Sequence, residues 1–174
     1  MAPQFVKPYV KSNKNDRRDA EAIAEAVTRP TRRLVPTKDV AQHDIQALHR
    51  VRERLRGERT ALVNEVHGLM HEYGMVMPKG VAKFRQAVVG QLEAEKDKLT
   101  PLSQEMFWKL VEEFAALEKQ LAYDQEKLEA LATTHPECQR LMTIPGIGPF
   151  SATALVAAVS DASAFKNGRQ CAAW

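Results

Sequence analysis

The chain has few aromatic residues, two cysteines and no long apolar run. Only 6% of its 174 residues are Phe, Trp or Tyr, and no apolar segment approaches the roughly 20 residues of a membrane-spanning helix. The N-terminus also lacks the apolar core of a signal peptide. Cys138 and Cys171 form no CxxC pair and have no nearby histidine pair, so neither a zinc site nor a disulfide framework is supported. We therefore expect a cytoplasmic protein with reduced thiols and no membrane contact.

Composition and charge indicate a mostly helical protein with an uneven charge distribution. The chain is 44% hydrophobic and 27% charged, and it is rich in Ala, Leu, Glu, Lys and Arg. The net charge of +3 conceals two opposite segments: residues 1–36 carry eight Lys and Arg against four Asp and Glu, while residues 91–134 carry five against ten. The basic segment favours contact with nucleic acid, and the acidic segment is suited to solvent or to a protein partner.

Asp16 and Asp19 are the strongest functional signal in the sequence. Carboxylates at positions i and i+3 lie on one face of a helix, close enough to share a divalent metal ion. The neighbouring cations would suit a phosphate backbone, and the pattern as a whole indicates metal-dependent chemistry on nucleic acid; these cations are Lys11, Lys14, Arg17 and Arg18. The alternative is that both aspartates are ordinary first-turn residues, favoured there by the helix dipole.

The first helix is expected over residues 17–28, because Pro30 cannot continue it. A short extended linker should follow and end near residue 39. Arg29, Arg32 and Arg33 bracket the proline. Phosphate contact and simple solvation are both open for this arginine cluster.

Two long heptad patterns predict an antiparallel coiled-coil hairpin. Residues 40–73 place leucines every seven residues at Leu48, Leu55, Leu62 and Leu69, with Ile45, Val66 and Tyr73 at companion positions. Arg52 and Arg59 interrupt this seam. A shorter helix is expected over residues 81–91, and Ser103 is a possible cap for the second long helix. The seam of that helix is Phe107, Leu110, Phe114, Leu117, Leu121, Asp124, Leu128 and Leu131.

Four histidines occur in the first heptad segment, at His43, His49, His67 and His71, and two of them have helical ligand spacing. His67 and His71 lie at i and i+4, which could in principle hold a metal, but no third ligand lies nearby. We therefore interpret the histidines as surface residues.

Residues 141–155 have the pattern of a helix-hairpin-helix. Gly146 and Gly148 permit a tight turn, and the helix after it would present unpaired backbone N–H groups to a DNA phosphate. Gly146, Ile147 and Gly148 are therefore candidate nucleic-acid contacts. The alternative is a compact helix connection without a ligand. A further helix is expected over residues 151–159, and another begins near residue 165, with Trp174 partly exposed.

An ordered series of motifs resembles the IS110 / IS1111 family of insertion-sequence transposases. The matching segments are Val6–Ala24, Val35–Lys38, Leu48–Leu55, Arg59–Asn64, Glu72–Gly74, Leu141–Pro149 and Gln170–Trp174. The resemblance implies an all-α chain with three parts: the end of a RuvC-like domain in residues 1–36, a coiled-coil hairpin in residues 37–134, and the start of a C-terminal domain with a helix-hairpin-helix in residues 135–174.

The resemblance also implies a chemistry. Asp16 and Asp19 match the last two members of the family's Asp-Glu-Asp-Asp tetrad, which binds Mg²⁺ in an enzyme that cleaves and joins DNA strands. The family's nucleophile is a serine, a structured RNA from the element can guide target choice, and the coiled coil helps to assemble a homo-oligomer. The expected activity is thus DNA transposition, a form of DNA recombination, with DNA as the principal partner.

Two departures from the family pattern lead us to expect a fragment truncated at both ends. No carboxylate precedes Asp16, and no serine matches the nucleophile, since Ser151, Ser160 and Ser163 come before the position of that motif. We expect the chain to bind Mg²⁺ weakly and to be inactive alone. The alternative is a helical nucleic-acid-binding or oligomerisation module without catalysis.

Overall fold

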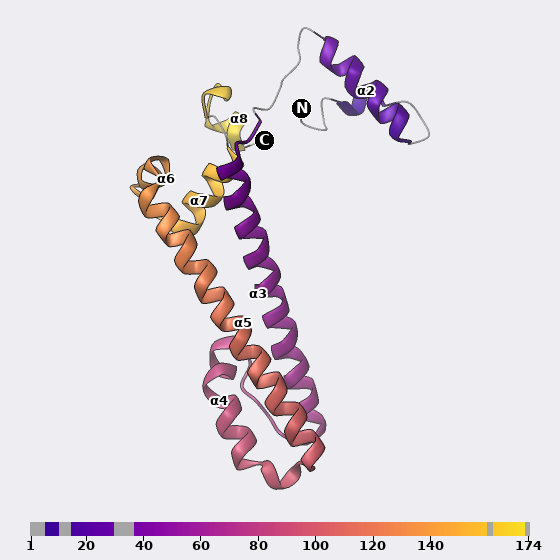
Figure 1. The fold of residues 1–174 in the computed structure, drawn as a ribbon, viewed down its shortest axis with the longest axis vertical. Helices are drawn as coiled ribbons and strands as arrows, with labels where there is room; N and C mark the ends of the chain where they lie inside the picture. The colour runs from indigo at the N-terminus through magenta and orange to yellow at the C-terminus, as the bar shows by residue number, and fades with distance from the viewer. Residues whose placement is uncertain (1–5, 11–14, 30–36, 160–161, 173–174) are drawn as a thin grey trace. The chain divides into compact units, whose positions relative to one another are not determined.

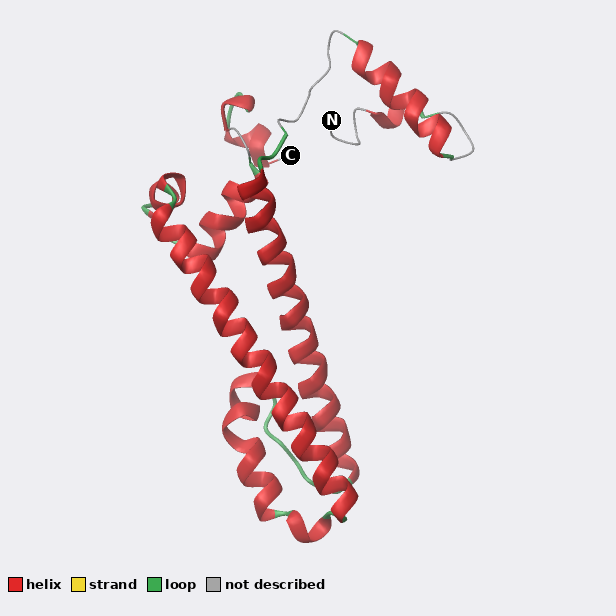
Figure 2. Ribbon diagram, in the orientation of Figure 1, coloured by secondary structure: helices red, strands yellow, loops and turns green. Residues whose placement is uncertain are grey.

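The computed structural model describes residues 6–10, 15–29, 37–159 and 162–172, and within these ranges the regular structure is entirely helical (Figures 1 and 2). No helix in the described part could span a membrane. The chain divides into two compact units, residues 1–39 with 160–174 and residues 40–159. The elements are η1 (Lys7–Tyr9), α2 (Asp16–Thr28), α3 (Val40–Glu72), α4 (Val81–Ala94), η2 (Lys96–Lys98), α5 (Pro101–Thr134), α6 (Pro136–Met142), α7 (Pro149–Ala158), η3 (Ala162–Ala164) and α8 (Gly168–Ala172).

Helix α2 begins one residue before its predicted start and ends at Thr28, as expected. The side chain of Asn15 accepts a hydrogen bond from the backbone N–H of Arg18, which caps the helix. Ala22 and Ala26 are buried, and α2 packs against η1. Small residues on this face allow the two short elements to approach closely.

The long helices α3 and α5 lie side by side and run antiparallel (Figure 1). Arg59 near the middle of α3 pairs with Glu118 of α5, whereas Ile45 near the start of α3 packs with Leu128 near the end of α5. The prediction of an antiparallel helical hairpin is therefore confirmed. A coiled-coil geometry for this pair stays a prediction.

The heptad assignment needs correction at both ends of the hairpin. Tyr73 lies beyond the end of α3 and is 37% exposed, although its ring contacts Phe107 edge-on at 5.7 Å. Leu131 is also 37% exposed, and Ala132 is buried in its place. A step of four from Leu128 returns to the same helical face at residue 132, which explains the shift.

The cap of α5 is Thr100, so the prediction of Ser103 was wrong. The Thr100 hydroxyl accepts a hydrogen bond from the backbone N–H of Ser103 at 3.3 Å, and the Ser103 hydroxyl hydrogen-bonds to the Thr100 carbonyl at 3.0 Å. Pro101 occupies the first helical turn, where the missing N–H costs nothing. Ser103 is therefore a buried residue of the first turn.

Helix α4 covers the end of the hairpin where α3 and α5 connect. It is three residues longer than predicted and buries Phe84 completely, with its ring 5.0 Å from that of Phe114. Met75 and Met77 in the preceding loop are buried, while Val76 is exposed. Met75, Met77, Phe84 and Phe114 belong, with buried residues of α3 and α5, to the largest hydrophobic core among the described residues.

At the opposite end, α7 packs against both long helices (Figure 1). A small core joins Ile45, Leu128 and Ala157, and a second joins Ala132, Cys138, Ala152 and Val156. The compact unit of residues 40–159 thus continues past the predicted domain boundary at residue 135, and the assignment of three domains stays a prediction. Trp174 lies outside the described residues.

Candidate nucleic-acid interface

Asp16 and Asp19 both lie in the first turn of α2. Asp16 is exposed and Asp19 is half-buried. Their spacing places both carboxylates on one helical face, where they are available to a shared ligand. The same geometry also suits the alternative of first-turn acids stabilised by the helix dipole. Among the described residues, no group of three or more His, Cys, Asp or Glu side chains could hold a metal ion.

The cations of α2 differ in how far they are engaged. Arg17 pairs with Glu21 at 3.6 Å, and its side chain remains 89% exposed. Arg29 is bound more closely, because it pairs with Glu25 at 2.6 Å and lies 5.5 Å from the centre of the Tyr9 ring. The hydrogen bond and charge of Glu25 raise the pKa of Arg29. Arg17 is thus freer than Arg29 to contact a phosphate.

Four of the predicted nucleic-acid-binding residues lie outside the described residues. They are Lys11, Lys14, Arg32 and Arg33. Their assignment therefore stays a prediction. For the arginine cluster, phosphate contact and simple solvation are both still open.

The turn between α6 and α7 brings Gly146, Ile147 and Gly148 together, but the three residues have different roles. Gly146 has φ of 90°, which favours glycine, whereas Gly148 has φ of −93°, which any residue adopts. The Ile147 N–H donates to the Ile144 carbonyl at 3.1 Å, and its half-buried side chain packs on the core around Cys138. Ile147 therefore anchors the turn, and only the two glycines are exposed.

Helix α7 begins with backbone donors that remain open. The Phe150 and Ser151 N–H groups have no hydrogen-bond partner among the described residues, since the first backbone bond of α7 runs from Ala152 to the Gly148 carbonyl at 2.9 Å. Gly148 occupies the N-cap position, and no side chain there caps the helix. Open N–H groups at a helix start can donate hydrogen bonds to a phosphate oxygen. A helix-hairpin-helix that binds DNA stays a prediction.

Polar contacts dock α7 onto α3, and one of them corrects the surface assignment of His49. The His49 Nε2 lies 3.0 Å from the hydroxyl of Thr153, which itself donates to the Pro149 carbonyl at 2.8 Å. Because that hydroxyl hydrogen is engaged, His49 Nε2 is the donor to Thr153. Burial lowers the pKa of His49, and the charge of Arg52 lowers it further. His49 is thus a half-buried contact between the two helices.

His67 is likewise not a surface residue. It is half-buried, its ring lies 5.6 Å from that of Phe84, and its Nε2 is buried without a hydrogen-bond partner among the described residues. His71, one turn further on, is exposed. The two rings therefore occupy different environments, which does not favour a shared metal.

Comparisons with known proteins cover the whole chain. A family model for transposases of the DEDD, IS110 type matches residues 1–75, and a model described as the transposase IS116/IS110/IS902 family matches residues 138–174. The chain belongs to the IS110 family of transposases. No solved structure matches it.

Among curated relatives of this IS110-family chain, the transposase for insertion sequence element IS1111A of Coxiella burnetii is 42% identical over 174 residues. That match covers 100% of this chain and 48% of the relative. The "Probable family 20 transposase" of Pseudomonas aeruginosa is 42% identical over 175 residues, which is 52% of its length. The transposase for insertion sequence element IS1328 of Yersinia enterocolitica is 36% identical, over 97% of this chain and 50% of its own length. The chain thus spans about half the length of these relatives.

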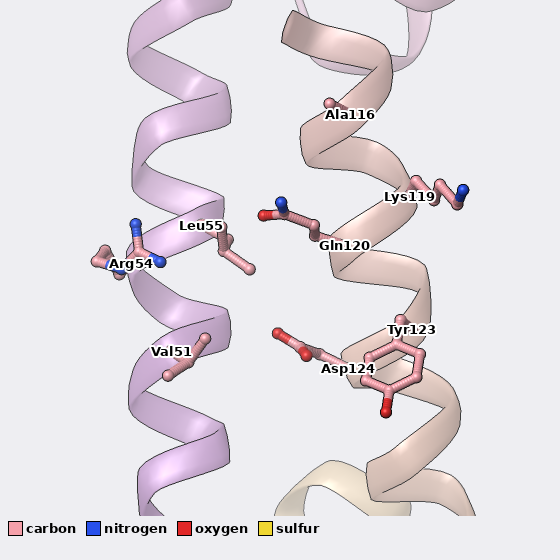
Figure 3. Close-up of a pocket in the computed structure, with 8 residues that line it drawn as sticks. All are labelled: Val51, Arg54, Leu55, Ala116, Lys119, Gln120, Tyr123 and Asp124. Carbon is pink, nitrogen blue, oxygen red and sulfur yellow. The ribbon is translucent and has the colours of Figure 1, made fainter.

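One buried carboxylate of this IS110-family chain was not singled out as a functional candidate from the sequence. Asp124 is 7% exposed, and its Oδ2 is buried without a hydrogen-bond partner among the described residues. It lines an open cleft of about 510 Å³ between α3 and α5, together with Val51 and Leu55 of α3 (Figure 3). The available signal was an aspartate within an otherwise apolar heptad seam.

Proposed function

We propose that this chain takes part in DNA transposition, as a segment of a transposase that binds the phosphate backbone and contributes two carboxylates to a metal site. The observation that carries this proposal is similarity along the entire chain to transposases of insertion sequences. The chain would act in the cytoplasm, with DNA as its partner. A structured guide RNA and a homo-oligomer held by the hairpin are further proposed partners.

The residues of α2 fit a role in holding Mg²⁺. Carboxylate oxygens are the donors that this ion prefers, and Asp16 and Asp19 are accessible on one helical face. They would supply two oxygen ligands, with Asp19 one turn along from Asp16. A divalent ion at such a site supplies positive charge that stabilises a phosphate under attack.

Two carboxylates alone are a poor Mg²⁺ site, because the ion keeps its water and needs a near-octahedral set of oxygens. Residues 1–15 contain no carboxylate, and no residue among 1–174 matches the family's serine nucleophile. We therefore propose that catalysis by this chain requires groups beyond Asp16 and Asp19, and that the isolated chain has no nuclease activity.

Phosphate binding would use the basic segment and the α6–α7 turn. Lys11, Lys14, Arg17, Arg18, Arg32 and Arg33 would contact the backbone electrostatically, and the exposed turn at Gly146 and Gly148 would admit a phosphate close to the main chain. None of these contacts reads a base. The expected binding is therefore independent of DNA sequence and strongly dependent on salt.

Binding of a fluorescent DNA duplex, measured by anisotropy across a range of salt concentrations, tests this proposal. Each lost phosphate contact should reduce the slope of log affinity against log salt by about 0.9. Replacing Lys11 and Lys14 together by glutamine should therefore lower the slope, whereas Lys119→Gln in the acidic segment should leave it unchanged. Binding that does not respond to salt would favour the alternative, a helical oligomerisation module without catalysis.

The metal role is tested separately. Asp16→Asn and Asp19→Asn should change neither the thermal midpoint nor DNA affinity of the isolated chain appreciably, because Asp16 is exposed, Asp19 is only half-buried, and the cap of the helix is Asn15. Incubation of the chain with plasmid and MgCl₂ should give no cleavage. Divalent-dependent cleavage abolished by either substitution would contradict the requirement for further catalytic groups.

A further inference from the structure

Arg52 lies at the joint between α3 and α7. Its guanidinium carbon is 4.1 Å from the centre of the Phe150 ring, and Phe150 is the second residue of α7. This short distance places the cation over the ring face, where the aromatic quadrupole attracts it. The Arg52 side chain is half-buried, and its Nε is buried without a hydrogen-bond partner among the described residues. The contact with Phe150 therefore leaves one strong donor unused.

Asp124 offers an unused acceptor on the opposite helix. Figure 3 shows its carboxylate directed from α5 toward α3, from which Leu55 points toward α5, and Val51 lines the same cleft. Arg52 precedes Leu55 by three residues, so the two side chains leave α3 on the same helical face. That face lies toward the Asp124 carboxylate. Burial and the nearby Arg56 lower the pKa of Arg52, and the charges of Glu53 and, more weakly, Asp124 oppose that lowering. The cation and the carboxylate are thus electrostatically coupled.

We propose that Arg52 is a switch residue with two positions, one over the Phe150 ring and one on the Asp124 carboxylate. In the first position it adds to the apolar and polar contacts that hold α7 against the hairpin, and in the second that contribution is lost, which makes undocking of α7 easier. The effect on nucleic acid rests on the proposed function of the α6–α7 turn. The exchange of Arg52 between its two positions does not depend on that function.

The two positions are balanced by opposing contributions. Pairing with Asp124 satisfies a buried carboxylate and a buried donor, but it also removes the ring contact. The docked position keeps the ring contact and two further bonds to α7, from His49 to Thr153 and from the Gln42 amide to the Val156 carbonyl at 3.3 Å. The docked position is therefore the major state, and the Asp124-paired position is the minor one. Substitutions at Phe150 and Asp124 should shift the population in opposite directions.

The test uses the full chain and two conservative variants. Asp124→Asn keeps the size of the side chain and removes its charge, which should favour the docked position. Phe150→Leu keeps an apolar side chain and removes the aromatic face, which should favour Asp124. The matched control is Glu126→Gln, which neutralises an exposed carboxylate on the same helix two residues away.

Two measurements report the exchange directly. In NMR spectra, the ring current of Phe150 should shift the Arg52 side-chain signals upfield, more so in Asp124→Asn, and the shift should disappear in Phe150→Leu. Hydrogen exchange at the α7 amides should be roughly two- to fivefold faster in Phe150→Leu and slower in Asp124→Asn. Amides at the middle of α3 should keep their exchange rates. Undocking changes exchange only in α7, whereas a general loss of stability would speed exchange in α3 as well.

Three results would overturn the proposal. They are an Arg52 ring-current shift that Asp124→Asn leaves unchanged, equal effects of Asp124→Asn and Glu126→Gln, and an unchanged or slower α7 exchange rate in Phe150→Leu. DNA affinity separates this proposal from the function of the turn. If the NMR and exchange results appear as expected but both variants bind DNA with unchanged affinity, the switch stands and the role of the turn in binding fails.

Discussion

Replacing Gly146 and Gly148 separately by alanine distinguishes the folding of the α6–α7 turn from its access to a phosphate. Gly146 has φ of 90°, where an L-residue brings its Cβ close to the following carbonyl oxygen. The cost of forcing an alanine into the left-handed region is about 1–2 kcal/mol in the free energy of unfolding. No heavy atom lies within 4 Å of an added Cβ at this position, so the whole cost arises from the backbone.

Gly148→Ala is the matched substitution, because its backbone is ordinary. Its φ is −93° and its ψ is 179°, and an added Cβ again meets no heavy atom within 4 Å. Alanine restricts the unfolded chain, which stabilises by about 0.4–1 kcal/mol, but it is a poorer N-cap than glycine by a similar amount. The two contributions nearly cancel, and the free energy of unfolding should change by less than about 0.5 kcal/mol.

Urea unfolding followed by circular dichroism, with hydrogen exchange to locate the effect, measures both variants. With a slope near 2 kcal/mol per molar urea, Gly146→Ala should lower the midpoint by about 0.5–1 M, and Gly148→Ala should leave it in place. DNA affinity at fixed salt should fall for Gly148→Ala, because its methyl group occupies the space beside the open N–H groups of α7. Equal loss of stability in both variants would refute the assignment of strain to Gly146, and unchanged affinity of Gly148→Ala would refute close approach of a phosphate.

Three further outcomes follow from the packing of the hairpin. Glu118→Gln should lower the free energy of unfolding by about 1–2 kcal/mol, because this carboxylate is only 20% exposed and accepts from one arginine of α3 and one of α4. Glu58→Gln, which removes an exposed ion pair, should lower it by less than about 0.5 kcal/mol. Urea unfolding of the two variants measures the difference. Phe84→Ala should cost about 3–5 kcal/mol in the same assay, because the side chain is fully buried, and a loss below about 1 would contradict its place in the core. Burial, and then the charge of Arg52, depress the pKa of His49 below its ordinary 6.5. Between the two pKa values the folded chain binds fewer protons at this site than the unfolded chain. The stability of the folded chain should therefore be highest above pH 6.5 and should fall as the pH is lowered toward the depressed pKa. That loss should be smaller in His49→Gln and unaltered in the exposed control His71→Gln, as thermal unfolding between pH 7 and 5 would reveal.

Local sequence signals predicted the elements well. The start of α2 was predicted to within one residue, and its end at Thr28 follows from Pro30, which cannot continue a helix. Heptad spacing located α3 to within a residue, because an apolar stripe 33 residues long leaves no other periodic structure. The cap of α5 was misassigned, since Thr100 and Ser103 are both cap formers and only the position of Pro101 in the first turn selects between them.

The candidate site could be predicted in part. Spacing alone placed Asp16 and Asp19 together on the first turn of α2. The distinction between Gly146 and Gly148 could not be predicted, since two glycines in a turn are equivalent until φ is known. Nor could the sequence foresee that Ile147 anchors the turn through its side chain, because its core partners lie on other helices.

By itself, the sequence determined the helical class, the bounds of α3 to within a residue and the family, because each depends on residues close together in the chain or on an ordered series of motifs. Only the tertiary structure decided that α7 packs against both α3 and α5, that His49 contacts Thr153, that Arg52 lies over the Phe150 ring, and that Asp124 shares a cleft with Leu55. These contacts join residues about 70 to 100 positions apart. Periodicity shows which face of a helix is buried, but not what buries it, and a polar residue in an apolar seam acquires its role from the side chain that folding places opposite.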